Sequence, residues 1–427
     1  MNNSFKTIIQ HHEMIDIIRS HKEADITVEE IKDRLAIARS TADRAFANLM
    51  DSENSLIIRD GKRATICGDK AFFLGISFGS LNTRFVLLGL DFEPVSLDSL
   101  CGASYTATLQ RIASYNPSES DDYSYAFKND DNNKTDDMRW ATIRKTIDTI
   151  LDIFLGLAEI YNEHNGKQGG IPLAGIGFGV TGPVNYAEKT WISTPRLNII
   201  KDITIQDLIG YKNANRITNL GIFLSLDNNV KASAVSEYQF LMETAKGQYS
   251  NDVAVIYVGS GIGCATIIDG KLLRGSGNMS GELGHICNLG ESESLEQCIE
   301  TRISSLADLP EEQRIDKELE IYIDNLKFIL KILNCVLGVD RFILVGHSIA
   351  KYNMLEHALM DNRFDFTVAS TQQYCHPADQ RKKPYTAAIG AAIESYYTMC
   401  NYRIDTEHEK GKKLSELTNL AQDISWR

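Results

Sequence analysis

The alternation of apolar and polar positions predicts a chain in which strands and helices follow one another. Strand-like apolar runs occur at FFLGISFG, RFVLLGLDF, LAGIGFGVTG, GIFLSLDNN, DVAVIYVGSGIGCATII and RFILVG. Apolar residues three and four apart predict an amphipathic helix over 138–162, and further helices are expected at 230–246, 311–338 and 386–398. Strands that alternate with helices in this way indicate an α/β body.

The chain also changes in texture along its length, which predicts a head and a two-part body. Residues 1–70 are helical in pattern and end in a short strand pair. Residues 71–200 are expected to form a first lobe and residues 201–427 a second, whose last helix could return to the first. Between about 102 and 137 the sequence is polar and acidic, which indicates a mobile insertion or long loop in the first lobe. Its acidic part, 116–137, is also a candidate contact surface for a protein partner.

Residues 27–67 have the pattern of a winged helix-turn-helix. Thr27 and Glu30 form a capping-box pair that starts a helix through VEEIKDRL, and Ser40 is the expected N-cap of a second helix, TADRAFANLM. The following SLIIRDGKRATI contains two strand-like runs joined at Asp60-Gly61, a favoured hairpin turn that would form the wing. Apolar residues able to pack the two helices across a tight turn are Ile31, Leu35, Ile37, Ala42, Ala45, Phe46 and Leu49.

The second helix of such a motif enters the DNA major groove by its N-terminal end. Arginines suit guanine edges, while hydroxyls and wing cations suit phosphates. Asp43 lies on the same face and opposes this interpretation. The alternative is a helical hairpin that packs on the body or on a partner with its charges solvated. The side chains expected to touch DNA are Arg39, Ser40, Thr41, Arg44, Arg59, Lys62 and Arg63.

Composition and charge restrict the class of protein. The chain has 427 residues, 43% of them apolar and 24% charged, as in globular proteins of two or three domains. No apolar run reaches the roughly 18 residues of a bilayer span. The first residues do not show the basic segment followed by an apolar segment that is typical of a signal peptide. Eight scattered cysteines without a CxxC pair indicate reduced thiols in the cytoplasm. The net charge is −13, and residues 1–70 hold 11 Lys and Arg against 12 Asp and Glu, so DNA binding would depend on a local basic patch.

Two segments of the body offer ligand chemistry. GSGIGCATIIDGKLLRG places a glycine-rich turn between strands, where backbone N–H groups can approach a phosphate, although a tight hairpin explains it equally well. GELGHI places Glu282 and His285 three residues apart, and a carboxylate with an imidazole suits sugar hydroxyls, which need both acceptors and donors. A structural carboxylate–histidine pair is the alternative.

The order of these motifs, a glycine-rich turn followed by DGK, G, GELGH and CIE, resembles the signature of the ROK family of repressors, open reading frames and sugar kinases. GIGFGVTGPVN, DNNVKASAVSE, NCVLGVDRFILVG and IGAAIES also match, so the resemblance spans nearly the whole chain. With its winged-helix head, the chain is similar to the repressor branch. The resemblance implies an N-terminal winged helix-turn-helix joined to a two-lobed, actin-like ATPase (sugar kinase) fold of the α/β class, with a sugar bound between the lobes.

The resemblance also assigns a sugar site. The Asn of the family's Pro-Asn motif falls on Arg196, whose added length and charge suggest an acidic or phosphorylated sugar. The other contacts come from an Asn-Asp pair, a GExGH motif and a CxE motif. The sugar-binding positions are then Asn228, Asn229, Glu282, His285, Glu300 and Arg196.

The residues of phosphoryl transfer are exchanged, so the resemblance implies no kinase activity. The family's general base, the Asp of its Asn-Asp pair, is here Asn229, and losing such a base costs roughly 10²–10⁴ in rate. The first phosphate loop has Ser77 in place of Asp and Leu81 in place of Thr, and LVGHS has His347 in place of a glycine. A hydroxyl does not organise Mg²⁺ and phosphate charge as a carboxylate does. The degenerate nucleotide-loop positions are Ser77, Gly79, Gly259, Ser260, Gly261, Gly263 and Gly346.

The structural zinc of the family is also expected to be lost. Its ligands are the GExGH His and three Cys of a CxCGxxGC run, which make a closed site. Here the loop is shortened to GHICNLGESESLEQCIE, in which His285 and Cys298 survive while Glu291 and Glu293 fall on two Cys positions. Cys287 could add a third thiolate only at a different spacing. No cofactor is expected.

Together these features predict a DNA-binding repressor of carbohydrate genes that senses a sugar without phosphorylating it. Two heads of a homodimer, or of a homotetramer, would bind a pseudo-palindromic operator. A sugar that binds two states of the body unequally would shift the balance between them. Two alternatives stay open: an active ROK sugar kinase with a regulatory head, and a regulator whose body binds a protein in place of a sugar.

Overall fold

The computed structural model forms two compact units. Unit 1 combines the described residues up to 248 with the helix at Thr386–Cys400, and unit 2 comprises described residues between 249 and 380. No described helix is long and apolar enough to cross a membrane. The structure describes residues 2–21, 26–50, 55–78, 82–95, 124–128, 136–164, 166, 169–192, 201–244, 252–258, 262–287, 293–346, 359, 367–370 and 386–401.

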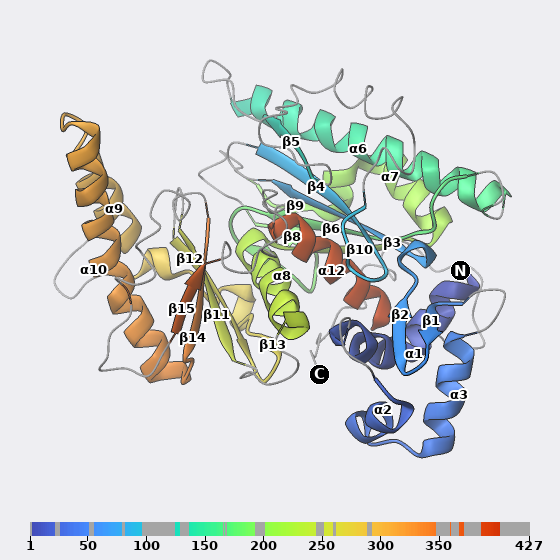
Figure 1. The fold of residues 1–427 in the computed structure, drawn as a ribbon. Helices are drawn as coiled ribbons and strands as arrows, with labels where there is room; N and C mark the ends of the chain where they lie inside the picture. The colour runs from blue at the N-terminus through green and yellow to red at the C-terminus, as the bar shows by residue number, and fades with distance from the viewer. Residues whose placement is uncertain are drawn as a thin grey trace. The chain divides into compact units, whose positions relative to one another are not determined.

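Unit 1 begins with three helices and a hairpin (Figure 1). The helices are α1 (Asn3–Ser20), α2 (Val28–Leu35) and α3 (Arg39–Leu49), and the hairpin pairs β1 (Ile57–Asp60) with β2 (Arg63–Ile66). The expected capping box is present, since Thr27 and Glu30 each hydrogen-bond the other's backbone N–H. Gly61 follows β1 with φ of +60°, a conformation that glycine adopts without a Cβ penalty. Helix, turn, helix and hairpin therefore occur in the expected order.

The start of α3 differs from the prediction. Ser40 was expected to be its N-cap, but the N-cap is Ala38, and Ser40 lies in the first helical turn. The turn is tighter because Ala36 ends α2 in the left-handed conformation, with φ of 52°. Burial of Ala42, Phe46 and Leu49 holds α3 in place without a side-chain cap.

The centre of unit 1 is a five-stranded sheet in the order β10-β6-β3-β4-β5. Strands β10 (Phe223–Asn228), β6 (Leu173–Val180) and β3 (Phe72–Phe78) are parallel, whereas β4 (Asn82–Gly89) and β5 (Ser124–Lys128) continue the sheet in antiparallel pairs. Strand β5 corrects part of the expectation for 102–137, because an edge strand lies where a loop was expected. Most of that segment is outside the described residues.

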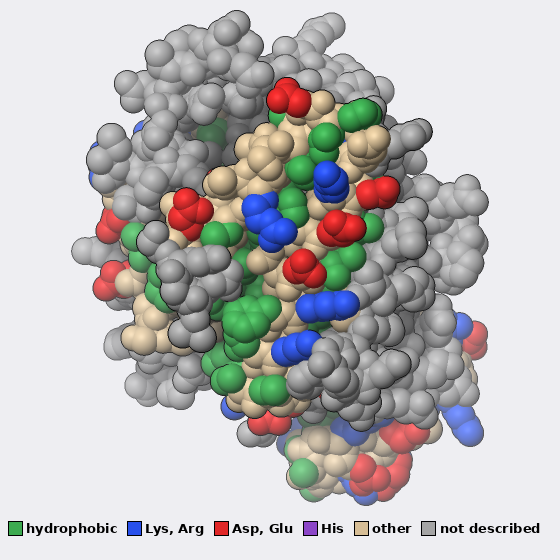
Figure 2. Space-filling view, turned by 90° about the vertical axis from the view of Figure 1, so that its left-hand side faces the viewer, with side chains coloured by type: hydrophobic (Ala, Val, Ile, Leu, Met, Phe, Trp, Pro, Cys, Tyr) green, Lys and Arg blue, Asp and Glu red, His purple; other side chains and the backbone are tan. Residues whose placement is uncertain are grey.

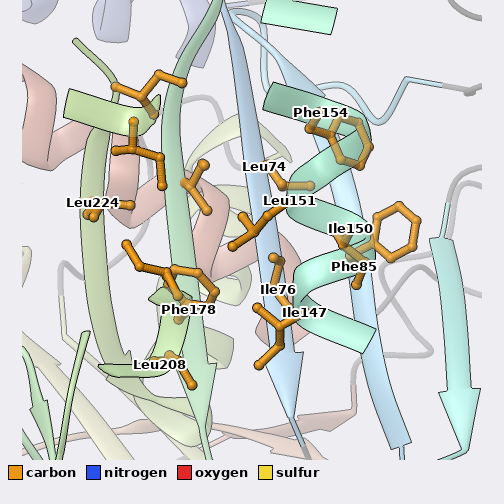
Figure 3. Close-up of a cluster of buried hydrophobic side chains, with 14 of the residues drawn as sticks. Leu74, Ile76, Phe85, Ile147, Ile150, Leu151, Phe154, Phe178, Leu208 and Leu224 are labelled. Carbon is orange, nitrogen blue, oxygen red and sulfur yellow. The ribbon is translucent and has the colours of Figure 1, made fainter. Parts of the chain in front are cut away.

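Large and small residues alternate along the central strands, and this alternation separates the two faces of the sheet. In β3 and β6, Leu74, Ile76 and Phe178 point toward helices α6 (Asp136–His164) and α7 (Ile205–Leu220), as Figure 3 shows. Each such fully buried side chain contributes about 1.5–3 kcal/mol. The cluster on this face is the main core of unit 1.

The opposite face is lined by glycine and covered by helices α12 (Thr386–Cys400) and α8 (Asn229–Thr244). A Cβ added at Gly177 would lie 1.7 Å from the carbonyl oxygen of Ala391, and one at Gly75 would lie 1.8 Å from that of Ala388. The absent side chains therefore let α12 lie directly on the backbone of β3 and β6. A small sheet, β7 (Val184–Asn185), β8 (Thr190–Trp191) and β9 (Ile203–Thr204), completes unit 1.

Unit 2 is built on a second sheet, in the order β13-β12-β11-β14-β15. Its core lies between this sheet and helices α9 (Leu295–Ser304) and α10 (Glu311–Leu337). Figure 2 views the molecule from the side of α10, where charged and hydrophobic side chains are interspersed. The strands are β11 (Val253–Val258), β12 (Ile262–Ile268), β13 (Lys271–Leu272), β14 (Arg341–Val345) and β15 (Thr367–Ser370).

The helices expected from periodicity correspond to α6, α8, α10 and α12, within three residues at each end. The domain boundaries expected from the sequence, 1–70, 71–200 and 201–427, stay predictions, because packing into one unit does not say which segments fold by themselves. Strand β10 and helix α8 pack in unit 1, where Phe223 of β10 pairs with Gly175 of β6, 48 residues earlier in the chain.

Candidate functional site

Helix α3 has one apolar face and one polar face. Ala42, Ala45, Phe46 and Leu49 are buried, and α2 packs against the same face. The seven side chains expected to touch DNA are all exposed, four on the N-terminal part of α3 and three around the hairpin: Arg39, Ser40, Thr41, Arg44, Arg59, Lys62 and Arg63. The structure therefore brings the predicted residues to the surface of one module.

Two of these arginines are already engaged. Arg39 hydrogen-bonds Asp43, with Nε 3.1 Å from both carboxylate oxygens, and also Glu29 of α2. Arg59 donates from Nε to the carbonyl of Gly61 at 2.9 Å, and its guanidinium lies 5.5 Å from the ring centre of Phe46. This second set of contacts fixes the hairpin against α3.

Two other cations of this surface, Arg44 and Lys62, differ from Arg39 in their surroundings. Among the described residues, the side chains of Arg44 and Lys62 have no ion-pair partner. Neither side chain has to leave a carboxylate before it meets a phosphate or base.

A second group of candidate residues lies where the parallel strands of unit 1 end. Ser77 of β3, Gly179 of β6 and Asp227 of β10 share one register position, and Phe78, Val180 and Asn228 share the next. The carboxyl ends of parallel strands are the usual place for ligands in open α/β sheets. Ser77 and Asn228 are buried at this edge, and Asn229 follows Asn228 as the first residue of α8.

Asn228 has both atoms of its amide group engaged within unit 1. Its Oδ1 accepts from the backbone N–H groups of Val230 (2.8 Å) and Lys231 (3.3 Å), and its Nδ2 donates to the carbonyl of Gly182 (2.8 Å). The side-chain oxygen thus caps the N-terminus of α8. For a sugar, Asn228 has only one further N–H to offer, so its part in the site is mainly to place Asn229.

Asn229 is held by a residue that the sequence motifs did not single out. Its Nδ2 lies 3.3 Å from Oγ1 of Thr181, and Thr181 donates its hydroxyl proton to the carbonyl of Phe78 at 3.0 Å. Because that proton is committed, the hydroxyl oxygen accepts from Asn229. In the sequence, Thr181 lies directly after a buried strand, within the segment GIGFGVTGPVN, but nothing there indicates its contact with Asn229.

In unit 2, Glu282 and His285 lie together at a short 3₁₀ helix, Leu283–His285. The Nε2 of His285 is 3.8 Å from Oε2 of Glu282, with 74% of the His285 side chain and 28% of the Glu282 side chain exposed. Glu300 is exposed on α9, which packs against this turn. An acceptor and a donor at an accessible turn suit hydroxyl-bearing ligands.

The nucleotide-loop positions are only partly described. Gly79, Gly259, Ser260, Gly261 and the sugar candidate Arg196 lie outside the described residues. Gly263 pairs with Tyr257 in β12, and Gly346 follows β14 with φ of +119°. The backbone N–H of Ile262, next to the glycine turn, donates to Oε1 of Glu296 on α9 at 3.2 Å. Ser77, at the position of the family's carboxylate, is 6% exposed.

The segment that corresponds to the family's zinc loop is described at His285, Cys287, Glu293 and Cys298, and Glu291 lies outside the described residues. Among the described residues, no group of three or more His, Cys, Asp or Glu side chains is arranged to hold a metal ion. Cys298 lies with its sulfur 3.9 Å from Oε2 of Glu293, and the sulfur of Cys287 lies 3.9 Å from the carbonyl of His285. The described cysteines, Cys67, Cys264, Cys287, Cys298, Cys335 and Cys400, are free thiols.

Comparison with known proteins finds a family model and two relatives that are similar to parts of this chain. The ROK family model matches residues 122–308. The chain contains a ROK family domain. A xylose repressor from Caldicellulosiruptor bescii is 29% identical over 134 residues, covering 29% of this chain and 30% of that protein. An uncharacterized protein from Clostridium perfringens is 41% identical over 73 residues, 17% of this chain and 23% of that protein. The aligned stretches thus span less than a third of either relative.

The fold is confirmed by a solved structure. A ROK family transcriptional regulator, a homologue of the E. coli MLC protein, has a TM-score of 0.55 at 14% identity and covers 91% of this chain and 98% of that chain. The similarity therefore confirms the expected ROK fold in the α/β class, and extends well beyond the ROK domain match. A ROK family glucokinase from Streptomyces griseus, solved with glucose and AMPPNP, has a TM-score of 0.48 at 15% identity and covers 76% of this chain and 98% of that chain.

Proposed function

We propose that this protein is a sugar-responsive transcriptional repressor whose ROK body binds a sugar and does not phosphorylate it. The observation that carries the proposal is the exposed row of hydroxyl and cationic side chains on α3 and the hairpin, in the same chain as a ROK domain. The xylose repressor among its relatives supports the direction of regulation. ROK proteins include kinases as well as repressors, so the catalytic residues decide between the two.

DNA recognition would use the first turn of α3 in the major groove, with the hairpin as a wing. Arg44 would reach base edges, and Lys62 and Arg63 would bind phosphates. An isolated head holds few phosphate contacts, so stable binding requires two heads. A homodimer with a two-fold axis would match a pseudo-palindromic operator.

Sugar recognition would use Asn229 in unit 1. Since the Asn229 nitrogen donates to Thr181, its oxygen is the group left to accept a sugar hydroxyl. In unit 2, Glu282 would accept and His285 would donate or accept, according to its tautomer. Glu300 and Arg196 complete the proposed set from the family motifs.

Loss of phosphoryl transfer would follow from two positions. Asn229 carries no basic carboxylate, and Ser77 offers a hydroxyl where the kinases carry an Asp for Mg²⁺ and phosphate. General-base removal alone costs about 10²–10⁴ in rate. The same site would then keep its affinity for sugar while ATP turnover is lost.

Three measurements on the full-length protein test this function. A thermal-shift screen with D-xylose, D-glucose, N-acetylglucosamine and glucose 6-phosphate should show stabilisation by at least one sugar, reduced in Glu282→Gln. Selection from a random duplex library should enrich a pseudo-palindromic sequence. A coupled assay with ATP, Mg²⁺ and the same sugars should show no ADP release above background. ADP release at about 1–100 per second, as in active kinases, would establish the enzyme instead.

A further inference from the structure

Arg19, near the end of α1, lies in the interior of unit 1. The residue is 2% exposed, and its Nε and Nη2 donate to the carbonyl of Leu90 at 3.2 and 2.9 Å. Its guanidinium carbon lies 3.6 Å from the ring centre of Phe92 and 4.7 Å from that of Tyr396. A buried guanidinium between two rings is a cation–π arrangement that binds its neighbours firmly.

Asp16 completes this cluster and brings in the end of α12. Its Oδ1 lies 2.5 Å from Nη1 of Arg19 and accepts from the hydroxyl of Tyr396 at 2.9 Å. One carboxylate oxygen thus joins α1, at the start of the chain, to α12, some 380 residues later. Removing one member of such a buried set leaves the others without partners.

Helix α1 is also part of the head, and it is not continuous. Its backbone is non-helical at His11, where φ is −125°. Before this kink, Phe5, Ile8 and Ile9 are buried, and His11 itself lies 3.4 Å from Nδ2 of Asn48 on α3. The segment after the kink holds Asp16 and Arg19. The kink residue therefore contacts α3, the proposed DNA-reading helix, and the segment after it contacts α12.

The other end of α12 reaches the proposed sugar site. Thr386, its first residue, donates to Oγ of Ser233 at 3.3 Å, and Ser233 donates to the carbonyl of Asn229 at 2.9 Å. The side-chain oxygen of the same residue, Asn229, is the group that we assign to a sugar hydroxyl. A helix of 15 residues is roughly 22 Å long, so α12 spans the distance between the two sets of contacts.

Close contacts leave α12 little room to bend or tilt between its ends. A Cβ added at Gly390 would lie 1.6 Å from the carbonyl oxygen of Ala232 on α8. The corresponding glycines of the sheet, Gly75 and Gly177, touch α12 from the other side. Packed interiors transmit displacement because they have no slack to absorb it.

We propose that α12 is a rigid connector that transmits the state of the Asn229 site to the DNA-reading head through the Asp16–Arg19–Tyr396 cluster and the kinked helix α1. The inference rests on the proposed function, since it names how that site is coupled to the head. Allosteric couplings of this kind change affinity by about 5–150-fold. The test of this connector is an energetic coupling between the Thr386–Ser233 hydrogen bond at one end of α12 and the Tyr396–Asp16 hydrogen bond at the other.

A double-variant cycle read by hydrogen exchange tests the connector without sugar or DNA. Thr386→Val removes the hydrogen bond at the site end of α12, and Tyr396→Phe removes the bond to Asp16 while keeping the ring over Arg19. Each single variant in the full-length protein should raise the exchange rate of α1 amides several-fold. If α12 acts as one body, the double variant should deviate at least fivefold from the product of the single effects.

Thr398→Val is the matched control. It removes a buried hydroxyl from the same helix, and in the described part of the chain that hydroxyl donates to the carbonyl of Glu394 one turn earlier. Combined with Thr386→Val, it should give multiplicative effects within about twofold, as independent sites do. The proposal is overturned if Thr386→Val leaves α1 exchange unchanged, or if its effect multiplies with that of Tyr396→Phe within twofold.

A second measurement uses the regulator's own response. The affinity for the selected duplex is compared without sugar and with D-xylose or D-glucose in excess of its dissociation constant. Tyr396→Phe should keep sugar stabilisation but lower the sugar-induced change in DNA affinity at least fivefold. An unresponsive wild-type protein would reject the proposed function, while the exchange cycle would still decide whether α12 couples its two ends.

Discussion

The Nε of Arg39 lies 3.1 Å from both carboxylate oxygens of Asp43, one turn further along α3. The hydrogen bonds that Arg39 donates to Asp43 and to Glu29 raise the pKa of Arg39, while the bonds from Lys32 and Arg39 lower the pKa of Glu29. The charge of Arg39 is therefore compensated within the head. For Arg39 to contact DNA it must leave two carboxylates, and Asp43 would then face the phosphates.

Asp43→Asn should therefore strengthen DNA binding. The change removes one negative charge from the proposed DNA face and loosens Arg39, which gains a phosphate contact. We expect affinity for the selected duplex to rise about threefold to tenfold, with the slope of log K against log salt steeper by about one. Fluorescence anisotropy at four salt concentrations measures both quantities.

Asp33→Asn is the control for Asp43→Asn. Asp33 is an exposed carboxylate of the same head, paired with Lys32 at 3.0 Å on α2. Its removal should change affinity by less than twofold, because Asp33 belongs to α2 and not to the proposed DNA-reading helix. Weaker binding by Asp43→Asn would mean that this carboxylate contacts DNA directly or that α3 does not enter the groove.

Replacing Arg44 and replacing Lys62 should affect DNA binding differently, the first through sequence preference and the second through the salt dependence of affinity. Arg44→Ala should cost about 1–3 kcal/mol and relax sequence preference at one position, as for a bidentate guanine contact. Lys62→Ala should weaken all sequences alike and reduce the salt slope by about one. Competition with single-position operator variants separates the two patterns. Lys145→Ala, an exposed lysine of α6, should change neither.

Glycine on the inner strands should be required for the packing of α12. Gly177→Ala would place a methyl group 1.7 Å from the carbonyl of Ala391, so α12 must move away at a cost of about 1–3 kcal/mol or more. Gly156→Ala is the matched change in α6, where no atom lies within 4 Å, and should stabilise by roughly 0.5–1 kcal/mol. Thermal melting of the two variants should therefore shift in opposite directions; equal shifts would contradict the close packing.

Much of the fold could be predicted from periodicity, because long amphipathic helices such as α6 and α10 repeat their apolar positions many times. The start of α3 could not, since a left-handed Ala36 shortens the turn and tertiary packing replaces the Ser40 cap. Strand β5 was missed because its five residues lie in a polar, acidic stretch and gain their pairing only from the edge of β4.

The candidate site shows the same limit. Asn229 and Ser77 could be recognised because motifs fix their positions, but the role of Thr181 could not, because it depends on three strands that end side by side. The contact of Asp16 with Tyr396 joins residues 380 positions apart, and no local pattern marks either of them. Long-range partners of this kind are set by topology and not by spacing.

Lys189 should make the stability of the protein depend on pH. The residue is 1% exposed in the β7–β8 hairpin, and burial lowers its pKa to about 8 from 10.5. Below pH 8 the buried ammonium group destabilises the folded state, and this penalty has its full size there. Between pH 8 and 10.5 the unfolded chain binds more protons than the folded one, so the free energy of unfolding rises with pH and the penalty disappears. Lys189→Met should therefore be more stable than the wild type at pH 7 by about 1–3 kcal/mol, given 1.36 kcal/mol per pKa unit. In thermal melts the advantage should fall by half or more at pH 10. The control Lys271→Met replaces an exposed lysine and should show no such change. An equal advantage for Lys189→Met at both pH values would mean that the folded wild-type protein stabilises the ammonium group of Lys189.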